Sequence, residues 1–234
     1  MLEAPDARYT VRGVAWTLAI AGQKGGTGKS TLAVSLASWW YSRGLRVLLV
    51  DADPQGTSAT WAEVAAERGH DAPPVVQLGD AIRRDLPRLS AAHDVVVVDL
   101  PGRAGGARTA GALLVADVAV LPCGPSAPDA WALAGTVDAL REVQALRPEL
   151  VARVVLTRAD RSSMTRAARE ALASCGVEVL ARSLGARVAV AEALAVGRGV
   201  TDHAPGSVAA LELRAIADEL EVLAGPLFPR EDTR

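Results

Sequence analysis

A glycine-rich segment near the start of the chain carries the clearest chemical signal in the sequence. Residues 23–31 read QKGGTGKST and follow an apolar run over residues 14–21. Such glycines let backbone N–H groups turn toward phosphate oxygens, and a helix that begins there adds partial positive charge. We therefore predict a phosphate-binding loop, with Gln23 standing where the usual form of this loop has its first glycine. The predicted binding residues are Lys24, Gly25, Gly26, Thr27, Gly28, Lys29, Ser30 and Thr31.

The distribution of lysine supports this prediction. Both lysines of the chain, Lys24 and Lys29, lie in the loop, although lysine and arginine together number 25. An ammonium group is a compact charge on a flexible stem, and it meets phosphate differently from the planar guanidinium of arginine. The placement of lysine therefore favours a loop that binds a ligand over a glycine-rich turn without one.

Three aspartates follow predicted strands and are the acidic candidates for the same site. Residues 51–56, DADPQG, follow the strand predicted over residues 46–50, and Asp99 follows four valines. An unpaired carboxylate at the end of a fully apolar strand would be costly, so a metal-linked role is favoured for Asp99. Asp51 either caps a strand end or belongs to the site.

Apolar runs alternate with segments of helical periodicity along the chain. The predicted strands are residues 14–21, 46–50, 75–78, 95–98, 118–121, 153–157 and 177–181, and the predicted helices are 29–42, 58–68, 80–90, 130–146, 165–174, 189–195 and 208–223. The proline-rich stretch 122–128 is predicted to be a surface loop. This order indicates an α/β fold, a doubly wound, mainly parallel sheet with helices on both faces. We expect a single domain over residues 1–234, with flexible segments at 1–12 and 225–234.

The composition excludes several classes of function. Half of the 234 residues are hydrophobic, but only 3% are aromatic, too few to stack the bases of single-stranded nucleic acid. The net charge of −2 excludes a globally basic nucleic-acid binder, so any contact with DNA must be local. Cys123 and Cys175 lack metal-ligand spacing and are expected to be small core residues. Tryptophans at helical spacing are expected to pack in the core or at an interface: Trp39, Trp40, Trp61 and Trp131.

Several motifs together resemble those of one known family. The loop has the deviant form K-G-G-x-G-K-[ST] over residues 24–30, and with it the sequence resembles the ParA/MinD family of ATPases, which have the P-loop NTPase fold. Residues 51–56 resemble the family's second acidic motif, and residues 95–101, VVVVDLP, resemble its Walker B strand. Residues 122–133, PCGPSAPDAWAL, are similar to the proline-rich stretch of small plasmid ParA proteins of the ParF type. The resemblance covers nearly the whole chain, and DADPQ is more typical of the ParA branch than of MinD.

The resemblance implies ATP and Mg²⁺ as cofactors and a role for each matching residue. Lys29 would bind the β- and γ-phosphates, and Asp53 would orient the attacking water. Ser30, together with Asp99 acting through water, would hold Mg²⁺. Lys24 would reach across an ATP-dependent homodimer to the nucleotide of the other subunit, which would couple catalysis to assembly.

The implied function is that of a ParA-type ATPase whose weak activity is stimulated by a partner. Such a protein would position plasmid DNA, chromosomal DNA or another cargo through ATP-dependent dimerisation and nonspecific binding to duplex DNA. Its expected partner is a ParB-like or cargo-adaptor protein, and its expected place is the cytoplasm, at the nucleoid.

Arginines of the C-terminal third are the candidates for the remaining contacts. Arg158, just past a predicted strand, would contact the adenine or else be a solvated loop residue. Arg187 is the preferred DNA contact because it lies in a loop between a predicted strand and a predicted helix. A patch that follows DNA phosphates would draw on Arg158, Arg161, Arg166, Arg169, Arg182, Arg187 and Arg198.

Two other functions fit the same fold. A MinD-like membrane-bound protein needs a basic amphipathic C-terminal helix, but residues 224–234, AGPLFPREDTR, contain two prolines and two acids. No apolar run approaches the roughly 18 residues of a membrane span either, so no membrane partner is expected. A metabolic or electron-transfer enzyme related to the nitrogenase iron protein would need cluster-ligating cysteines, and neither cysteine stands in such a motif.

Overall fold

A parallel sheet organises the residues that this computed structural model describes, 15–102, 106–160, 162–173 and 175–225. Its seven strands are β1 (Trp16–Ile20), β2 (Val47–Asp51), β3 (Val75–Gln77), β4 (Val95–Asp99), β5 (Val118–Cys123), β6 (Val151–Ala159) and β7 (Glu178–Gly185). They lie in the order β3-β2-β4-β1-β5-β6-β7, and neighbours pair in parallel. The predicted α/β fold is confirmed. The segments expected to be flexible, 1–12 and nearly all of 225–234, lie outside the described residues.

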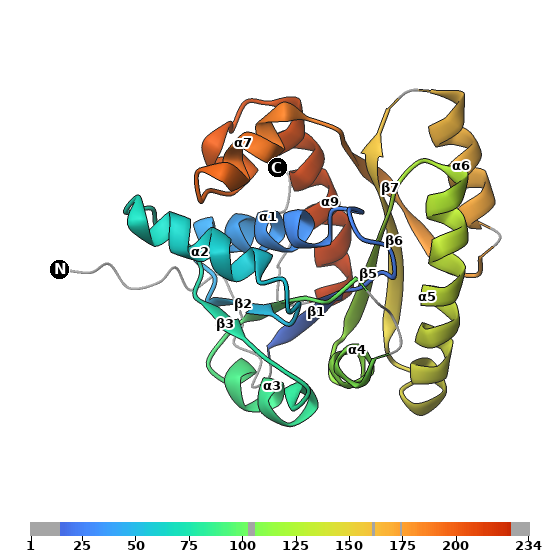
Figure 1. Cartoon of the computed structure of the whole chain (residues 1–234), viewed down its shortest axis with the longest axis horizontal. Helices are drawn as coiled ribbons and strands as arrows, with labels where there is room; N and C mark the ends of the chain where they lie inside the picture. The colour runs from blue at the N-terminus through green and yellow to red at the C-terminus, as the bar shows by residue number, and fades with distance from the viewer. Residues whose placement is uncertain (1–14, 103–105, 161, 174, 226–234) are drawn as a thin grey trace.

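Helices cover both faces of the sheet (Figure 1). One face carries α1 (Lys29–Ser42), α2 (Thr57–Glu67), α7 (Val188–Ala195), α8 (Val200–His203) and α9 (Val208–Ala224). The other carries α3 (Ile82–Ser90), α4 (Ala107–Leu113), α5 (Ala127–Leu146) and α6 (Ser163–Ala173). Side chains of β1 alternate between the two cores, with Trp16 and Leu18 in the first and Ala19 in the second. Because such strands are buried on both faces, they are continuous apolar runs in the sequence.

Some element boundaries differ from the sequence prediction. Neither α4 nor α8 was predicted, because helices of 7 and 4 residues are too short to show a clear period. The predicted loop over residues 122–128 is shorter than expected and covers residues 124–126, because β5 continues to Cys123 and α5 begins at Ala127. The pairing of β5 with β1 ends at Val120, so Pro122 lies in a part of β5 that pairs only with β6. A residue without an N–H is tolerated at such a position.

The edge strand β7 is longer than predicted, and charged side chains cover its backbone. Glu219 of α9 accepts hydrogen bonds from the backbone N–H groups of Ala181 and Arg182, at 2.8 and 2.7 Å. Glu212 accepts another from Gly185 at 2.9 Å. An unpaired strand edge is a site of unwanted pairing, and these carboxylates satisfy donors that a neighbouring strand would otherwise satisfy.

The expectation for the cysteines was partly wrong. Cys123 is buried in the core as expected, whereas Cys175 is only partly buried. Of the tryptophans expected in the core or at an interface, Trp40 and Trp61 are buried in the core, and Trp131 on α5 is 74% exposed, which leaves the interface as its predicted place.

Candidate nucleotide-binding site

A cavity of about 660 Å³ opens at the carboxyl ends of the central strands. The loops that follow β1, β2 and β4 surround it, which is where parallel α/β sheets bind ligands. Its lining consists of Gly25, Gly26, Gly28, Lys29, Ser30, Thr31, Asp53, Pro54, Gln55, Thr57, Pro101 and Gly102. The three segments singled out in the sequence are therefore brought together at one site.

The glycine-rich loop has the strand–loop–helix context that was predicted. Gly26 and Gly28 have φ values of 74° and 88°, a backbone region that other residues rarely adopt. Gly28 is the N-cap of α1, so the first N–H groups of that helix face the cavity side of the loop. Thr157 at the end of β6 donates a hydrogen bond of 2.8 Å to the carbonyl of Thr27 and ties the loop to the sheet.

Lys29 places a positive charge inside this loop. Its side chain is buried, and its Nζ donates to the carbonyl of Lys24 at 3.1 Å. Burial lowers the pKa of Lys29, while the nearby carboxylates of Asp99 and Asp53 act in the opposite direction. Gly102 has no side chain to crowd this amine, since a Cβ there would lie 3.4 Å from Nζ. A buried ammonium group of this kind is suited to an anionic ligand.

Asp99 is the buried acid of the site. Its Oδ2 accepts a hydrogen bond of 2.8 Å from Ser58 on α2, and Ser30 also contacts it. Its Oδ1 is buried and has no hydrogen-bond partner among the described residues. Burial raises the pKa of Asp99 to about 6. An unpartnered carboxylate oxygen beside the Ser30 hydroxyl fits a magnesium site, because Mg²⁺ takes few protein oxygens and keeps waters and phosphate oxygens as its other ligands.

The loop after β2 is held by Asp51, for which the sequence left two roles open. The Asp51 side chain is buried and accepts hydrogen bonds from the backbone N–H groups of Asp53 at 3.0 Å and Ala59 at 2.9 Å. It therefore organises the loop and the first turn of α2. Asp53 itself lines the cavity and accepts a hydrogen bond from the N–H of Gln55 at 3.0 Å.

Two residues of this region were not identified from the sequence. Ser58 holds Asp99, and Arg108 on α4 donates to the carbonyl of Ala52 at 2.9 Å, directly before Asp53. Arg108 also forms an ion pair of 2.9 Å with Asp80. Ser58 lies two residues past DADPQG in the first turn of a helix, and this position is a weak sequence signal for a role at the site. The sequence carries no such signal for Arg108.

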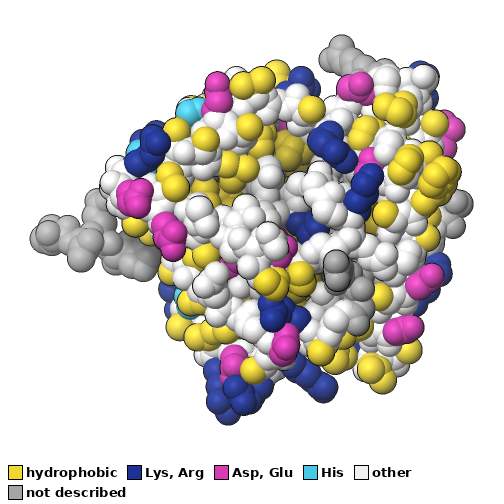
Figure 2. Space-filling view, viewed as in Figure 1, with side chains coloured by type: hydrophobic (Ala, Val, Ile, Leu, Met, Phe, Trp, Pro, Cys, Tyr) yellow, Lys and Arg dark blue, Asp and Glu magenta, His cyan; other side chains and the backbone are white. Residues whose placement is uncertain are grey.

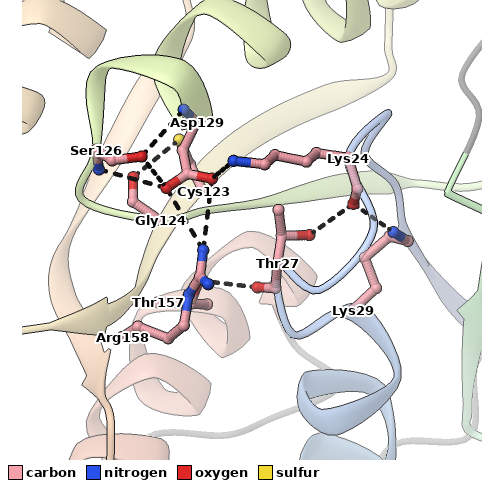
Figure 3. Close-up of polar contacts among 9 residues, drawn as sticks. All are labelled: Lys24, Thr27, Lys29, Cys123, Gly124, Ser126, Asp129, Thr157 and Arg158. Atoms are coloured by element: carbon pink, nitrogen blue, oxygen red, sulfur yellow. Dashed lines mark hydrogen bonds and ion pairs between the residues drawn. The ribbon is translucent and has the colours of Figure 1, made fainter.

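Lys24 and Arg158 meet at a third residue that was not predicted, Asp129 (Figure 3). The Nζ of Lys24 lies 2.6 Å from Asp129 Oδ1, and Nη2 of Arg158 lies 3.4 Å from both carboxylate oxygens. Asp129 also forms a capping box with Ser126 at the start of α5. Both basic side chains thus contact the same carboxylate of their own chain.

The arginines of the C-terminal third do not form one patch. Arg187 lies in the β7–α7 loop, as predicted, and its Nη2 is paired with Glu212 at 2.6 Å. Arg158, Arg182 and Arg187 line one groove of about 850 Å³, whereas Arg198 lines a different cavity beside His70. Arg161 is outside the described residues. Figure 2 shows that basic side chains on this face lie at several separate places.

A family comparison agrees with this geometry. A family model described as the CobQ/CobB/MinD/ParA nucleotide binding domain matches residues 18–200. The chain belongs to this family. The match includes the glycine-rich loop, the loop after β2 and Asp99.

The relatives of this ParA/MinD-family chain are positioning ATPases. It is 34% identical to maintenance of carboxysome distribution protein A of Halothiobacillus neapolitanus, over 88% of this chain and 96% of that protein. It is 31% identical to the chromosome-partitioning ATPase Soj of Thermus thermophilus, over 87% of this chain and 94% of that protein. A solved ATP complex of a McdA variant from Cyanothece has the same fold, with a TM-score of 0.70, 18% identity and coverage of 94% and 99%. The predicted resemblance to ParA-type partition ATPases is confirmed.

The alternative of a membrane-bound protein depended on the C-terminal segment, and residues 226–234 lie outside the described part of the chain. None of the helices in the described residues is long and apolar enough to cross a membrane.

Proposed function

We propose that this protein is a slow, Mg²⁺-dependent ATPase that positions a cargo by switching between a monomer and an ATP-bound dimer. The observation that carries the proposal is that Lys29 and Asp53 line one cavity at the start of α1, with the buried carboxylate of Asp99 close enough to act on the charge of Lys29. Phosphoryl transfer depends mainly on positioning and on neutralising charge. This set of residues is suited to both tasks.

Each residue of the set has a distinct task. Lys29 would move its amine from the Lys24 carbonyl to the phosphates of ATP. Ser30 and Asp99 would hold Mg²⁺, which when bound neutralises charge on the phosphate oxygens. Asp53, whose backbone is fixed by Asp51, would orient the attacking water. No arginine lines the cavity within the described residues, which is consistent with a slow basal rate.

Dimerisation would supply the missing charge through Lys24. Its side chain is 41% exposed, and its Nζ would have to leave Asp129 of its own chain to reach a second subunit. A charge that arrives only in the dimer would make hydrolysis depend on assembly. Duplex DNA and a ParB-like or cargo-adaptor protein are the proposed partners of the dimer, in line with relatives that are named for carboxysome distribution and chromosome partitioning.

The test compares two single variants by light scattering with ATP. Lys24→Ala should remain monomeric, because it removes the charge that joins the subunits. Asp53→Ala should form the dimer and remain in it, because it affects only the water. Identical behaviour of the two variants, or ATP-dependent dimers of Lys24→Ala, would contradict the assigned roles.

The proposed DNA contact is Arg187, with Arg158 and Arg182 beside it in the groove. The Glu212 carboxylate already neutralises Arg187, so one groove should attract DNA weakly. A dimer would present two grooves to one duplex, and this would make binding depend on ATP.

A further inference from the structure

A second cavity, of about 430 Å³, lies on the sheet face that α1, α2 and α7 cover together (Figure 1). In the described part of the chain, it shares no lining residue with the candidate nucleotide cavity. Its walls come from the second half of α1, from α2 and the segment after it, and from the turn between α7 and α8. The lining residues are Ser38, Tyr41, Ser42, Trp61, Gly69, His70, Asp71, Pro73, Arg198, Gly199 and Asp202.

The turn over residues 197–199 is fitted against both α1 and α2. Gly197 has a φ of 71°, and a Cβ there would overlap with the backbone of Ala65 on α2. A Cβ at Gly199 would lie 2.5 Å from the Cβ of Ser38 on α1. Both positions therefore require glycine, because the chain passes directly over the two helices. This close approach fixes the wall of the cavity that carries Arg198.

Arg198 is the cation of this cavity. Its N–H donates to the carbonyl of Ala193 at 3.0 Å, and its carbonyl accepts from Trp61 Nε1 at 3.3 Å, so its backbone is held at both polar atoms. Its exposed side chain, by contrast, has no hydrogen bond or ion pair among the described residues. His70 adds no second positive charge at neutral pH, because partial burial and the charges of Arg198 and Arg68 lower its pKa.

Asp202 is the matching anion. Its side chain also has no hydrogen bond or ion pair within the described residues, whereas the other carboxylate of the cavity, Asp71, accepts from the Tyr41 hydroxyl at 2.8 Å. Although the residue as a whole is exposed, loss of water around its carboxyl group raises the pKa of Asp202, while the charges of Arg198 and Arg214 act in the opposite direction. The protein therefore stabilises the charge of Asp202 incompletely. One positive and one negative side chain thus line the same cavity without forming an ion pair with each other.

The cavity carries one more polar group without a partner. The side chain of Ser38 is buried, and its hydroxyl has no hydrogen-bond partner in the described structure. The volume lies within the range of small-molecule sites, roughly 300–1,000 Å³, but the lining is mainly polar, which favours a polar ligand. A ligand with one group of each sign can pair with both charges, whereas an ion of one sign leaves the opposite charge without a partner.

Free α-amino acids are the common metabolites that carry a carboxylate and an ammonium group close together at neutral pH. We infer that this cavity binds a free α-amino acid, whose carboxylate pairs with Arg198 and whose ammonium group pairs with Asp202. This site goes beyond the proposed function, because it needs neither nucleotide nor a second subunit.

The experiment titrates the full chain with each standard amino acid, by calorimetry and by thermal unfolding. At least one amino acid should bind, and at about ten times its Kd it should raise Tm by about 3–6 °C, because a ligand that binds only the folded chain stabilises it. Acetate and ethylammonium each carry only one of the two charges, so each should bind about tenfold more weakly or worse. The absence of binding by every amino acid at millimolar concentration, or equal binding by either single ion, would overturn the inference.

Two variants assign the binding to this cavity. Arg198→Gln and Asp202→Asn each remove one charge from an exposed side chain, and each should weaken amino-acid binding by about tenfold or more. The matched control is Arg68→Gln, which removes a charge near His70 from a residue that does not line the cavity, and it should bind like the unmodified protein. Unchanged binding in Arg198→Gln or Asp202→Asn, or an equal loss in Arg68→Gln, would refute the assignment.

A last comparison separates this cavity from the candidate nucleotide cavity. Saturating ADP should leave the affinity for the amino acid unchanged, because the two cavities have no lining residue in common among the described residues. Loss of amino-acid binding in the presence of ADP would place the ligand in the nucleotide cavity and contradict the inference. If circular dichroism shows that one of Arg198→Gln and Asp202→Asn does not fold, the other decides the question.

Discussion

The hydrogen bond from Ser58 to Asp99 should contribute measurably to stability, although no sequence motif marks it. Ser58 is fully buried, and its hydroxyl lies 2.8 Å from Asp99 Oδ2. Because Asp99 Oδ1 has no partner among the described residues, Ser58→Ala leaves the carboxylate with little besides Ser30. A hydrogen bond to a charged group contributes about 1.5–3 kcal/mol. We expect Ser58→Ala to lose roughly 2 kcal/mol of the free energy of unfolding, which lowers Tm by about 4–8 °C for a domain of this size.

The chain offers a matched control for this substitution. Ser38 on α1 is buried as well, but its hydroxyl has no hydrogen-bond partner in the described structure. Ser38→Ala removes the same atom without breaking a hydrogen bond, and alanine favours a helix slightly more than serine does. It should therefore leave Tm unchanged or raise it.

The assay is thermal unfolding followed by circular dichroism, with EDTA present and without nucleotide, so that ligand binding does not contribute. The difference between the two variants isolates the hydrogen bond to Asp99. A fall in Tm for Ser58→Ala no larger than that for Ser38→Ala would refute the reasoning.

Three other predictions concern ligand binding and turnover. Lys29→Ala should abolish the binding of Mg-ATP, because it removes the buried charge of the phosphate loop, and unchanged affinity in calorimetry would remove the basis of the proposed function. Arg108→Ala should lower kcat by about tenfold with little change in KM, because Arg108 holds the carbonyl directly before Asp53 and does not hold the nucleotide. Arg141→Ala, on the exposed face of α5, is the control. At low salt, the ATP-bound protein should retard unrelated DNA duplexes in a gel, and this retardation should disappear as the salt concentration rises. Arg187→Ala should weaken the binding of all these duplexes to the same degree. Equal binding with ATP and ADP would contradict a nucleotide-dependent switch.

Much of the site could be predicted from the sequence because its determinants are local. The glycine-rich loop needs consecutive residues with special backbone freedom, followed by a helix, and this pattern is visible in residues 23–31 alone. The order of strands and helices was also visible, since strands buried on both faces are uninterrupted apolar runs. The edge strand β7 was predicted less well because polar residues such as Arg182 interrupt its apolar pattern.

The residues that support the site required the tertiary structure. Ser58 and Asp99 are 41 positions apart, and Lys24 and Asp129 are 105 apart, so these contacts follow from how α2 and α5 pack against the sheet. The alternative roles of Asp51 were likewise decided only when two backbone N–H groups were found on its carboxylate. The sequence by itself determined which chemical groups the protein has and which strand or helix carries each one. Only the folded chain decided which groups touch, because a side chain's partner depends on the packing of elements that are distant in the sequence.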